Sequence, residues 1–435
     1  MKHNLVVRAL VGILLVIAAG IVVHAPLTVW LGTLLPDHVQ YIKAWKEVLM
    51  GVALVLLIVA ASRRKLAGAL MQDRLMQLAL VYAGLHFVLV GVFQNGLAQA
   101  GAGLLIDLRY VLYFILVYGT ILMYPKYRGG FIKVFAAGAV VVVAFSLLQQ
   151  FVLPHNFLAH IGYSKSTIAP YLLVDENPMF VRINSTLRGP NPLGAYTVVV
   201  LALLAAFAMR NNLKQRDWWL LGGAALAAGL TLGASYSRGA LIGTVVALVA
   251  VLAVSLTGRV RRKVGLALAV VAVLVAGGLY ALRGTEFVSN VILHDNPTTG
   301  AEIDSNSAHV DSLANGIERV AYRPLGSGIG STGSASLEGS EPLIIENQYL
   351  FVAHEVGWVG LVLFAWLYVE ILKRLWLYRR SALALGAFAS GLGLATIGIF
   401  LPVWADDTVS IVWWGLAAIA IAAVPQGGHH ARKSH

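Results

Sequence analysis

Runs of about 18 to 20 mostly apolar residues, each long enough to cross the ~30 Å hydrocarbon core of a membrane as a helix, recur along this chain of 435 residues. Only 12% of the residues are charged, which is about half the share in soluble domains. No stretch between the apolar runs is composed like a separate soluble domain. The sequence therefore predicts an all-α polytopic membrane protein with a single transmembrane domain over residues 1–435.

Hydropathy predicts about twelve transmembrane helices. The first apolar segment follows Lys2 in the manner of a signal peptide, but we expect it to be a true first span. The expected spans are residues 5–24, 44–61, 75–97, 104–124, 130–152, 192–209, 217–235, 239–256, 264–283, 347–372, 381–402 and 408–424.

The formal net charge of +12 is explained by membrane orientation. All but ten of the 32 Lys and Arg residues fall at the N-terminus, in every second connection or in the C-terminal tail. Basic residues concentrate in short cytoplasmic loops. We therefore expect a multi-pass protein of the bacterial inner (plasma) membrane, with both termini cytoplasmic, membrane lipids around it and no nucleic-acid partner. We expect the tail histidines His429, His430 and His435 to be solvated and to bind no metal.

The same alternation places two long polar connections, residues 153–191 and 284–346, on the periplasmic side. Long ordered loops in a compact protein are usually functional. We expect the second long periplasmic loop to contain short helices and active-site residues.

Ten basic residues break the orientation rule, and a cation near membrane depth tends to bind an anion. Of these ten, Lys43 and Lys46 are expected to snorkel at the interface. Arg109 lies two residues from Asp107 within a span, and because such positions do not share a helix face, each should have another partner. The ten are Lys43, Lys46, Arg109, Lys165, Arg182, Arg188, Arg238, Arg283, Arg319 and Arg323.

Arg188 and Arg238 are the strongest candidates for binding a phosphate group. Arg188 precedes a predicted helix in which Pro192 suits the first turn and Asn191 the cap, so that backbone N–H groups and the guanidinium can hold an anion together. Arg238 lies at the outer junction of two spans, at a depth that suits a lipid-linked diphosphate. The alternative for both residues is binding of ordinary anionic phospholipid.

The second long loop ends beside the tenth span with two further features. Residues 323–330 (RPLGSGIG) are Gly-rich, but no strand precedes them and they lie outside the cell, so a nucleotide loop is rejected. Glu346 lies at the top of the tenth span, where a carboxylate either favours the helix dipole or acts as a general base facing an outer cavity. His354 is interpreted as a packed or hydrogen-bonded helix residue.

At these residues the sequence resembles the O-antigen ligase family, within a superfamily of GT-C-like membrane glycosyltransferases that includes O-antigen polymerases. The matching pieces occur in the family's order along nearly the whole chain. They are residues 187–194 (LRGPNPLG), 237–241 (SRGAL) and 323–330, then Asn347 and, after a nine-residue spacer, residues 357–360 (GWVG).

The resemblance implies a metal-independent, cofactor-free O-antigen ligase that transfers a glycan from undecaprenyl diphosphate to the lipid A–core of lipopolysaccharide, with inversion, at the periplasmic face. It implies that Arg188 and Arg238 hold the diphosphate and stabilise the leaving group. We expect Glu346 to complete the catalytic residues. The expected substrate-binding residues are Arg319, Arg323, Asn191, Asn347 and Tyr349.

One departure from the family's pattern keeps other functions open. The ligases usually carry His before the residue that corresponds to Asn347, whereas this chain has Glu346. Related polymerases often have acidic residues near this point, so an O-antigen or exopolysaccharide polymerase is the main alternative. A transporter of lipid-linked sugar is disfavoured because it would need charged residues along a path through the bilayer, and a non-catalytic scaffold does not explain the outlying arginines.

Overall fold

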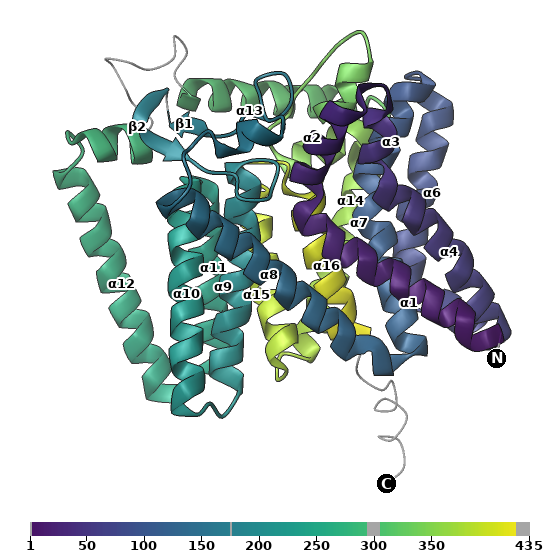
Figure 1. Ribbon diagram of the computed structural model, residues 1–435, viewed down its shortest axis with the longest axis horizontal. Coiled ribbons are helices and arrows are strands. Elements are labelled where there is room, and N and C mark those ends of the chain that lie inside the picture. The colour runs from purple at the N-terminus through teal and green to yellow at the C-terminus, as the bar shows by residue number, and fades with distance from the viewer. Residues whose placement is uncertain (1, 175, 294–304, 423–435) are drawn as a thin grey trace.

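The computed structural model describes residues 2–174, 176–293 and 305–422 (Figure 1). The tail histidines, expected to be solvated, lie outside these residues. Every expected span overlaps a helix, and residues 423–424 of the last one lie outside the described residues. These helices are α1 (Lys2–Gly20), α4 (Trp45–Arg63), α6 (Arg74–Phe93), α7 (Leu97–Met123), α8 (Arg128–Phe151), α9 (Pro190–Arg210), α10 (Gln215–Ser235), α11 (Arg238–Ser255), α12 (Gly258–Ala281), α14 (Gln348–Leu377), α15 (Ala382–Ile397) and α16 (Asp407–Ala422).

The expectation of an all-α polytopic membrane protein is confirmed. In the described part of the chain, ten helical stretches are long and apolar enough to cross a membrane. The first of them runs over Leu5–Leu34, because η1 (Ile21–Val23) and α2 (His24–Leu34) continue α1 without a break. The last two expected spans, α15 and α16, are shorter apolar helices of 16 residues each.

Short elements connect these helices. On the side of the bundle where α13 lies are η2 (Pro36–His38), α3 (Val39–Lys43), η4 (Phe157–Ile161), η5 (Val288–Leu293), α13 (Ser305–Tyr322), η6 (Gly333–Glu338) and η7 (Val403–Ala405), together with an antiparallel hairpin of β1 (Leu172–Val174) and β2 (Asn177–Arg182). The remaining short elements are α5 (Ala67–Met71) and η3 (Pro125–Tyr127). Figure 1 shows α13 and the hairpin across one end of the bundle, whereas α1 begins and α16 ends at the opposite end.

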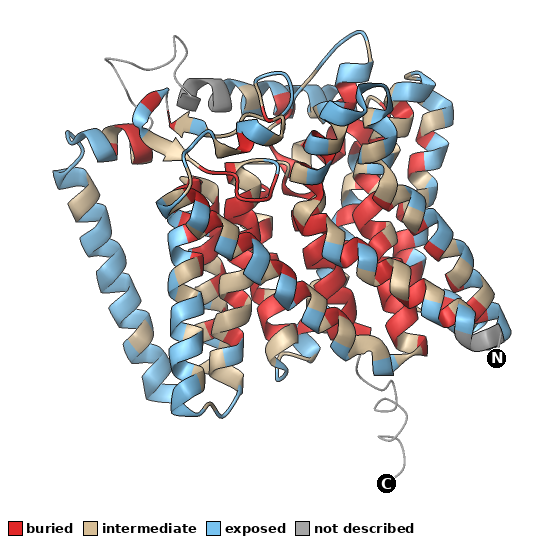
Figure 2. Ribbon diagram, in the orientation of Figure 1, coloured by how far each residue is buried: buried red, intermediate tan, exposed pale blue. Residues whose placement is uncertain are grey.

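The buried core lies around α16, whose residues are almost all buried (Figure 2). It packs against α7 and α15, and α15 packs in turn against α9 and α11. Trp413 and Trp414 are fully buried there, and the indole of Trp413 donates to the Ala387 carbonyl oxygen at 3.0 Å. By contrast α12 has no buried residue, which suits a helix whose apolar side chains face lipid.

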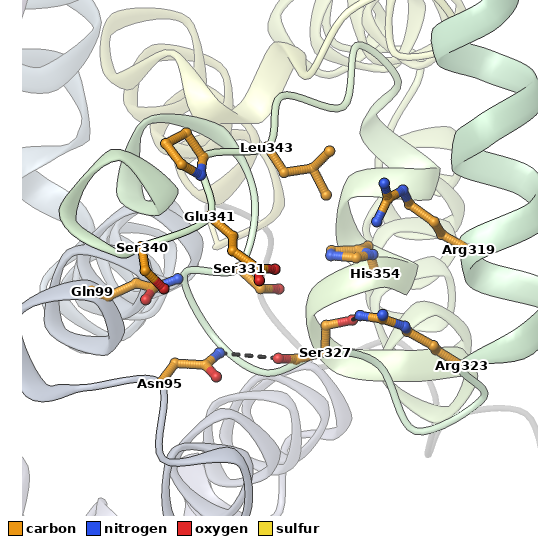
Figure 3. Close-up of a pocket in the computed structure, with 11 residues that line it drawn as sticks. Asn95, Gln99, Arg319, Arg323, Ser327, Ser331, Ser340, Glu341, Leu343 and His354 are labelled. Carbon is orange, nitrogen blue, oxygen red and sulfur yellow. Dashed lines mark hydrogen bonds between the residues drawn. The ribbon is translucent and has the colours of Figure 1, made fainter.

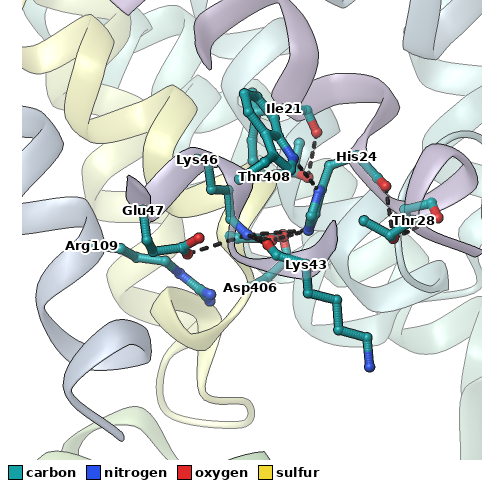
Figure 4. Close-up of polar contacts among 12 residues, drawn as sticks. Ile21, His24, Thr28, Lys43, Lys46, Glu47, Arg109, Asp406 and Thr408 are labelled. Carbon is teal, nitrogen blue, oxygen red and sulfur yellow. Dashed lines mark hydrogen bonds and ion pairs between the residues drawn. The ribbon is translucent and has the colours of Figure 1, made fainter. Parts of the chain in front are cut away.

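Lys46 does not snorkel, and that prediction was wrong. Its side chain is only 3% exposed, and its Nζ lies 3.1 Å from Asp407 Oδ2 and 3.2 Å from Glu47 Oε1 (Figure 4). The Trp45 indole donates to His24 Nδ1 at 2.9 Å, so the proton of this ring lies on Nε2, which is 3.0 Å from Asp407 Oδ2. The sequence could not foresee this cluster because Asp407 is more than 350 positions away along the chain.

The prediction of separate partners for Asp107 and Arg109 is confirmed. Asp107 Oδ2 lies 3.8 Å from His86 Nε2 on α6. The Arg109 guanidinium donates instead to the Ala405 carbonyl oxygen in η7. Arg109 therefore anchors the short connection between α15 and α16, which carries part of the site described next.

Candidate active site

Arg188 lines a largely apolar cavity of about 410 Å³, here called the Arg188 cavity. Its walls come from the start of α9, the segment around η6, α14, and the connection from α15 to α16. The lining residues are Leu172, Arg188, Gly189, Pro190, Asn191, Pro192, Ala195, Gly333, Ser334, Leu337, Ile344, Ile345, Phe351, Ile397, Leu401, Pro402, Val403, Ala405, Asp406 and Val409. A cationic group at the edge of an apolar cavity suits an amphiphilic anion.

The helix that follows Arg188 starts two residues earlier than predicted. Pro190 is its first residue, and Gly189 precedes it in an extended conformation without a side-chain cap. Asn191 therefore does not cap the helix, as had been expected. Its Oδ1 instead accepts from the Arg182 guanidinium at 2.6 Å, and Arg182 Nε donates to the Ser235 carbonyl oxygen at 3.0 Å. Arg182 thus joins β2 to the start of α9 and the end of α10.

The Arg188 side chain is exposed to the cavity. Within the described chain it makes no hydrogen bond or ion pair, although its charge acts on the Asp406 carboxylate. The neighbouring arginines are engaged by protein groups, so Arg188 is the guanidinium that is available to a ligand in this cavity. Gly189 and Pro190 place the first turn of α9 beside it, where the positive dipole end of the helix favours an anion, although Pro190 and Pro192 leave Asn191 as the N–H donor of the first three positions.

Asp406 is the carboxylate of the Arg188 cavity. It is 9% exposed, and its Oδ1 accepts from the Val409 backbone N–H at 2.9 Å. Its Oδ2 is buried and has no partner among the described residues. Burial, and then the adjacent Asp407 carboxylate, raise the pKa of Asp406 to about 6, although the Val409 N–H and the charge of Arg188 act in the opposite direction. A carboxylate of this kind can accept a proton near neutral pH.

The start of α14 holds the Asp406 segment in place. The Gln348 backbone N–H donates to the Gly398 carbonyl oxygen at 2.8 Å, and its side-chain Oε1 accepts from Trp404 N at 2.8 Å. Asn347 caps α14, because its Oδ1 accepts from the backbone N–H groups of Tyr349 and Leu350, and its Nδ2 donates to the Ile399 carbonyl oxygen at 2.7 Å. These bonds fix the connection from α15 to α16 against α14.

The remaining predicted residues of this segment lie beside the cavity. Tyr349, expected to bind substrate, donates its hydroxyl to the Ala395 carbonyl oxygen of α15 at 2.7 Å. Glu346 is half-buried directly before the cap residue of α14. The Arg188 cavity is lined by its neighbour Ile345 and not by Glu346 itself.

Arg238 begins α11 beside the start of α9 without lining the Arg188 cavity. It is half-buried, and its guanidinium donates to the Ile292 carbonyl oxygen of η5 at 3.2 Å. The α10–α11 turn packs so closely on α9 that a Cβ at Gly194 would lie 2.7 Å from Ala240 Cβ and 2.9 Å from Ser237 Cβ. The structure therefore brings the two arginine motifs together, while Arg238 itself is bonded to η5.

Arg319 and Arg323 line a different cavity, of about 310 Å³, here called the polar cavity (Figure 3). Both come from the end of α13 and its connection to the Gly-rich segment, and Arg323 donates to Ser327 Oγ at 2.9 Å. His354 of α14 lines the same cavity, is only 2% exposed, and has no partner at Nδ1 among the described residues. The predicted arginines are thus divided between two cavities.

The Gly-rich segment supplies backbone hydrogen bonds that α14 lacks where this helix is interrupted. Gly357 has φ +68° and interrupts this helix. The N–H groups of Ser327 and Gly328 donate to the carbonyl oxygens of His354 and Glu355 at 2.6 and 3.1 Å, and Trp358 N donates to the Pro324 carbonyl oxygen at 2.9 Å. A backbone group left unpaired at membrane depth is costly, so this segment is part of the transmembrane structure.

Small residues are required where the Gly-rich segment packs. Gly326, Gly328 and Gly330 all have positive φ, at +85°, +90° and +79°. A Cβ at Gly328 would lie 2.5 Å from Phe93 Cβ, and one at Gly330 would lie 2.3 Å from the Gln99 carbonyl oxygen. The segment is therefore pressed between α14 and the facing ends of α6 and α7, and Ser327 lines the polar cavity.

Sequence reasoning missed Asp406 and the place of His354 in the lining of the polar cavity. The sequence signal for Asp406 is an acidic pair, Asp406 and Asp407, directly before an apolar helix. His354 was correctly expected to be packed, but its place beside Arg319 depends on how α13 lies across α14. No local pattern encodes that packing.

Residues 223–365 match the family model described as O-antigen ligase. This stretch runs from α10 through the Gly-rich segment into α14, and it contains Arg238, Arg319, Arg323, Glu346 and His354. It supports assignment to the O-antigen ligase family, as the motifs had indicated. No curated protein matches the chain significantly.

Proposed function

Starting from assignment of this membrane protein to the O-antigen ligase family, we propose that it transfers a glycan from undecaprenyl diphosphate to lipid A–core. The observation that carries the proposal is the Arg188 cavity, in which an available guanidinium and a buried carboxylate, Asp406, line one largely apolar space. We propose that the protein lies in the inner membrane with both termini in the cytoplasm and this cavity facing the periplasm.

The cavity suits the chemistry of the donor. A prenyl diphosphate needs an apolar surface for its lipid and a cation for its phosphates. Leu337, Ile344 and Leu401 supply the first, and Arg188 with the start of α9 supplies the second. In the transfer, the acceptor hydroxyl attacks the anomeric carbon, the bond from that carbon to the phosphate oxygen breaks, and the diphosphate leaves with both bonding electrons. The guanidinium stabilises the charge that develops on that oxygen.

Two carboxylates are candidates for the base that takes the hydroxyl proton. Glu346 was expected from the sequence and lies beside the cavity. Asp406 lines the cavity and has an oxygen without a partner among the described residues. We propose Asp406 as the base and Glu346 as the group at the acceptor side, with Arg238 holding η5 over the donor.

The experiment is transfer by purified protein from undecaprenyl diphosphate glycan to purified lipid A–core. We expect Arg188→Gln and Asp406→Asn to lower kcat/KM at least ~100-fold, because they remove leaving-group stabilisation and proton transfer. Arg283→Gln is the matched control, since Arg283 is an exposed arginine that, among the described residues, contacts only the Tyr280 ring and carbonyl oxygen. Full activity of both site variants would refute the assignment.

The same assay separates the two bases and the two reactions. Loss of activity in Glu346→Gln with normal activity in Asp406→Asn would show that Glu346 is the base. Polymerisation of O-antigen or exopolysaccharide is the second candidate, favoured by Glu346 in place of the histidine usual in ligases. Transfer only to a second undecaprenyl-linked glycan would establish that reaction.

A further inference from the structure

The polar cavity and the Arg188 cavity share one wall. Residues 331–345 contribute Ser331, Ser340 and Leu343 to the polar cavity, and Gly333, Leu337 and Ile345 to the Arg188 cavity. Arg319 and Arg323 therefore reach a space on one side of this segment, and Arg188 a space on the other.

The lining of the polar cavity differs from that of a lipid site. It consists mainly of amides, hydroxyls and charged groups, from Asn95, Gln99, Arg319, Arg323, Ser327, Ser331, Ser340, Glu341 and His354, with Pro342 and Leu343 as its apolar members. Figure 3 shows the two arginines and His354 on one side of this space and Asn95, Gln99 and Ser340 on the other. Amides, hydroxyls and a carboxylate are the groups that bind sugar hydroxyls.

The cavity also has features of a built anion site. Two guanidiniums face one carboxylate, that of Glu341, so their charges do not cancel. His354 Nδ1 and Ser331 Oγ are buried without a partner among the described residues. A buried polar atom without a partner is costly, and a ligand that bonds to both would remove that cost.

We propose that the polar cavity binds an acidic saccharide, a sugar unit that carries a phosphate or carboxylate group. Arg319 and Arg323 bind the anionic group, and His354, Ser331 and the Glu341 carboxylate bind its hydroxyls. Only the link between this site and transfer rests on the proposed function; the binding itself does not. The acidic unit belongs either to the acceptor, as a phosphate, or to the donor glycan, as a uronic acid.

The first test is binding, measured by saturation-transfer NMR on protein in nanodiscs with glucose 6-phosphate, glucuronic acid and glucose as probes. We expect both acidic probes to bind at least tenfold more tightly than glucose. This preference should be lost in Arg319→Gln/Arg323→Gln and kept in Arg188→Gln and Arg283→Gln. Loss in Arg188→Gln alone, or equal binding of all three probes, would overturn the proposal. If the double variant does not fold, His354→Asn should weaken binding of the acidic probes.

The second test identifies the source of the acidic unit in the transfer assay. One arm compares lipid A–core before and after removal of its phosphates, and the other compares donors with and without uronic acid. The wild type should show a KM difference of at least tenfold in one arm, and the double variant none. Equal KM values in both arms would show that the polar cavity does not bind a substrate of the transfer reaction. The two proposals can fail separately. Loss of transfer in Arg188→Gln with normal sugar binding would support the proposed function, and full transfer by this variant would refute it.

Discussion

Lys46 Nζ lies 3.1 Å from Asp407 Oδ2, and the lysine is 3% exposed (Figure 4). The same oxygen lies 3.0 Å from His24 Nε2. α2, α4 and α16 are therefore joined at one carboxylate, directly beside the Asp406 of the Arg188 cavity. This buried ion pair stabilises the fold, because removing either partner leaves the charge of the other buried without a partner.

Lys46→Met should destabilise the protein strongly. Loss of one partner from a buried ion pair costs about 3–5 kcal/mol, and within the described part of the chain Asp407 would keep only the ion pair with His24. Thermal unfolding in detergent measures the effect. Lys43→Met is the matched control, because Lys43 is exposed and only its backbone carbonyl oxygen contacts Lys46, at 3.0 Å. Equal melting temperatures for the two variants would show that the pair contributes nothing.

Asp406→Asn should raise stability at pH 7 more than at pH 4. The pKa of Asp406 in the folded protein, about 6, lies above its usual value of 3.8. Between these values the folded state binds more protons than the unfolded state, so the stability of the wild type falls as pH rises through this window. Asn keeps an oxygen for the Val409 N–H and carries no charge.

The measurement for this variant is the difference in Tm between Asp406→Asn and the wild type at the two pH values. Asp37→Asn serves as control, since Asp37 is an exposed carboxylate in η2. A difference that does not grow with pH would contradict an elevated pKa. Wild-type transfer should rise between pH 5 and pH 7, around the pKa of about 6 in the folded protein, if Asp406 is the base.

Gly326→Ala should lower both stability and transfer. Gly326 has φ +85°, and a Cβ there would lie 2.7 Å from Gly357 N and 2.8 Å from the Glu355 carbonyl oxygen. Gly96→Ala is a close control, because Gly96 has φ +88° and a Cβ there would meet no atom within 4 Å. Both positions have a positive φ that disfavours a side chain, so a larger loss in Gly326→Ala is attributed to the contact with α14.

Asn347→Ser and Asn347→Ala should separate a capping role from substrate binding. Ser keeps an oxygen that can accept from Tyr349 N and Leu350 N, whereas Ala lacks it and should cost about 1 kcal/mol or more relative to Ser. Both variants lose the Nδ2 donor to the Ile399 carbonyl oxygen. Equal Tm values for the two variants would contradict the capping role, and normal transfer by Asn347→Ser would exclude the Asn347 amide from substrate binding.

The spans were predictable because hydropathy and charge act locally, over one helix and one loop. The motif around Arg188 was recognisable for the same reason, since a helix start after a Gly-Pro pair is a short-range pattern. Its details were not: Asn191 was expected to cap α9, but Arg182 of β2 binds it instead. A competing partner from another element cannot be read from the motif alone.

The division of the arginines between two cavities could not be predicted from the sequence either. Arg188 and Arg323 are both outer-side cations beside Pro and Gly, and nothing local distinguishes them. The distinction arises from residues 331–345, which contribute to both cavities. Lys46 shows the same limit, because its burial depends on an acidic residue at the far end of the chain.

The break in α14 has a consequence for engineering this protein. Pro324, Ser327 and Gly328 supply the backbone bonds that the helix lacks around Gly357. The outer loop and the span below it are thus one cooperative unit, although hydropathy divides them at the membrane surface. A chimaera that exchanges this loop between relatives must carry the first three turns of α14 with it, and one joined at residue 347 would pair each loop with a foreign helix break.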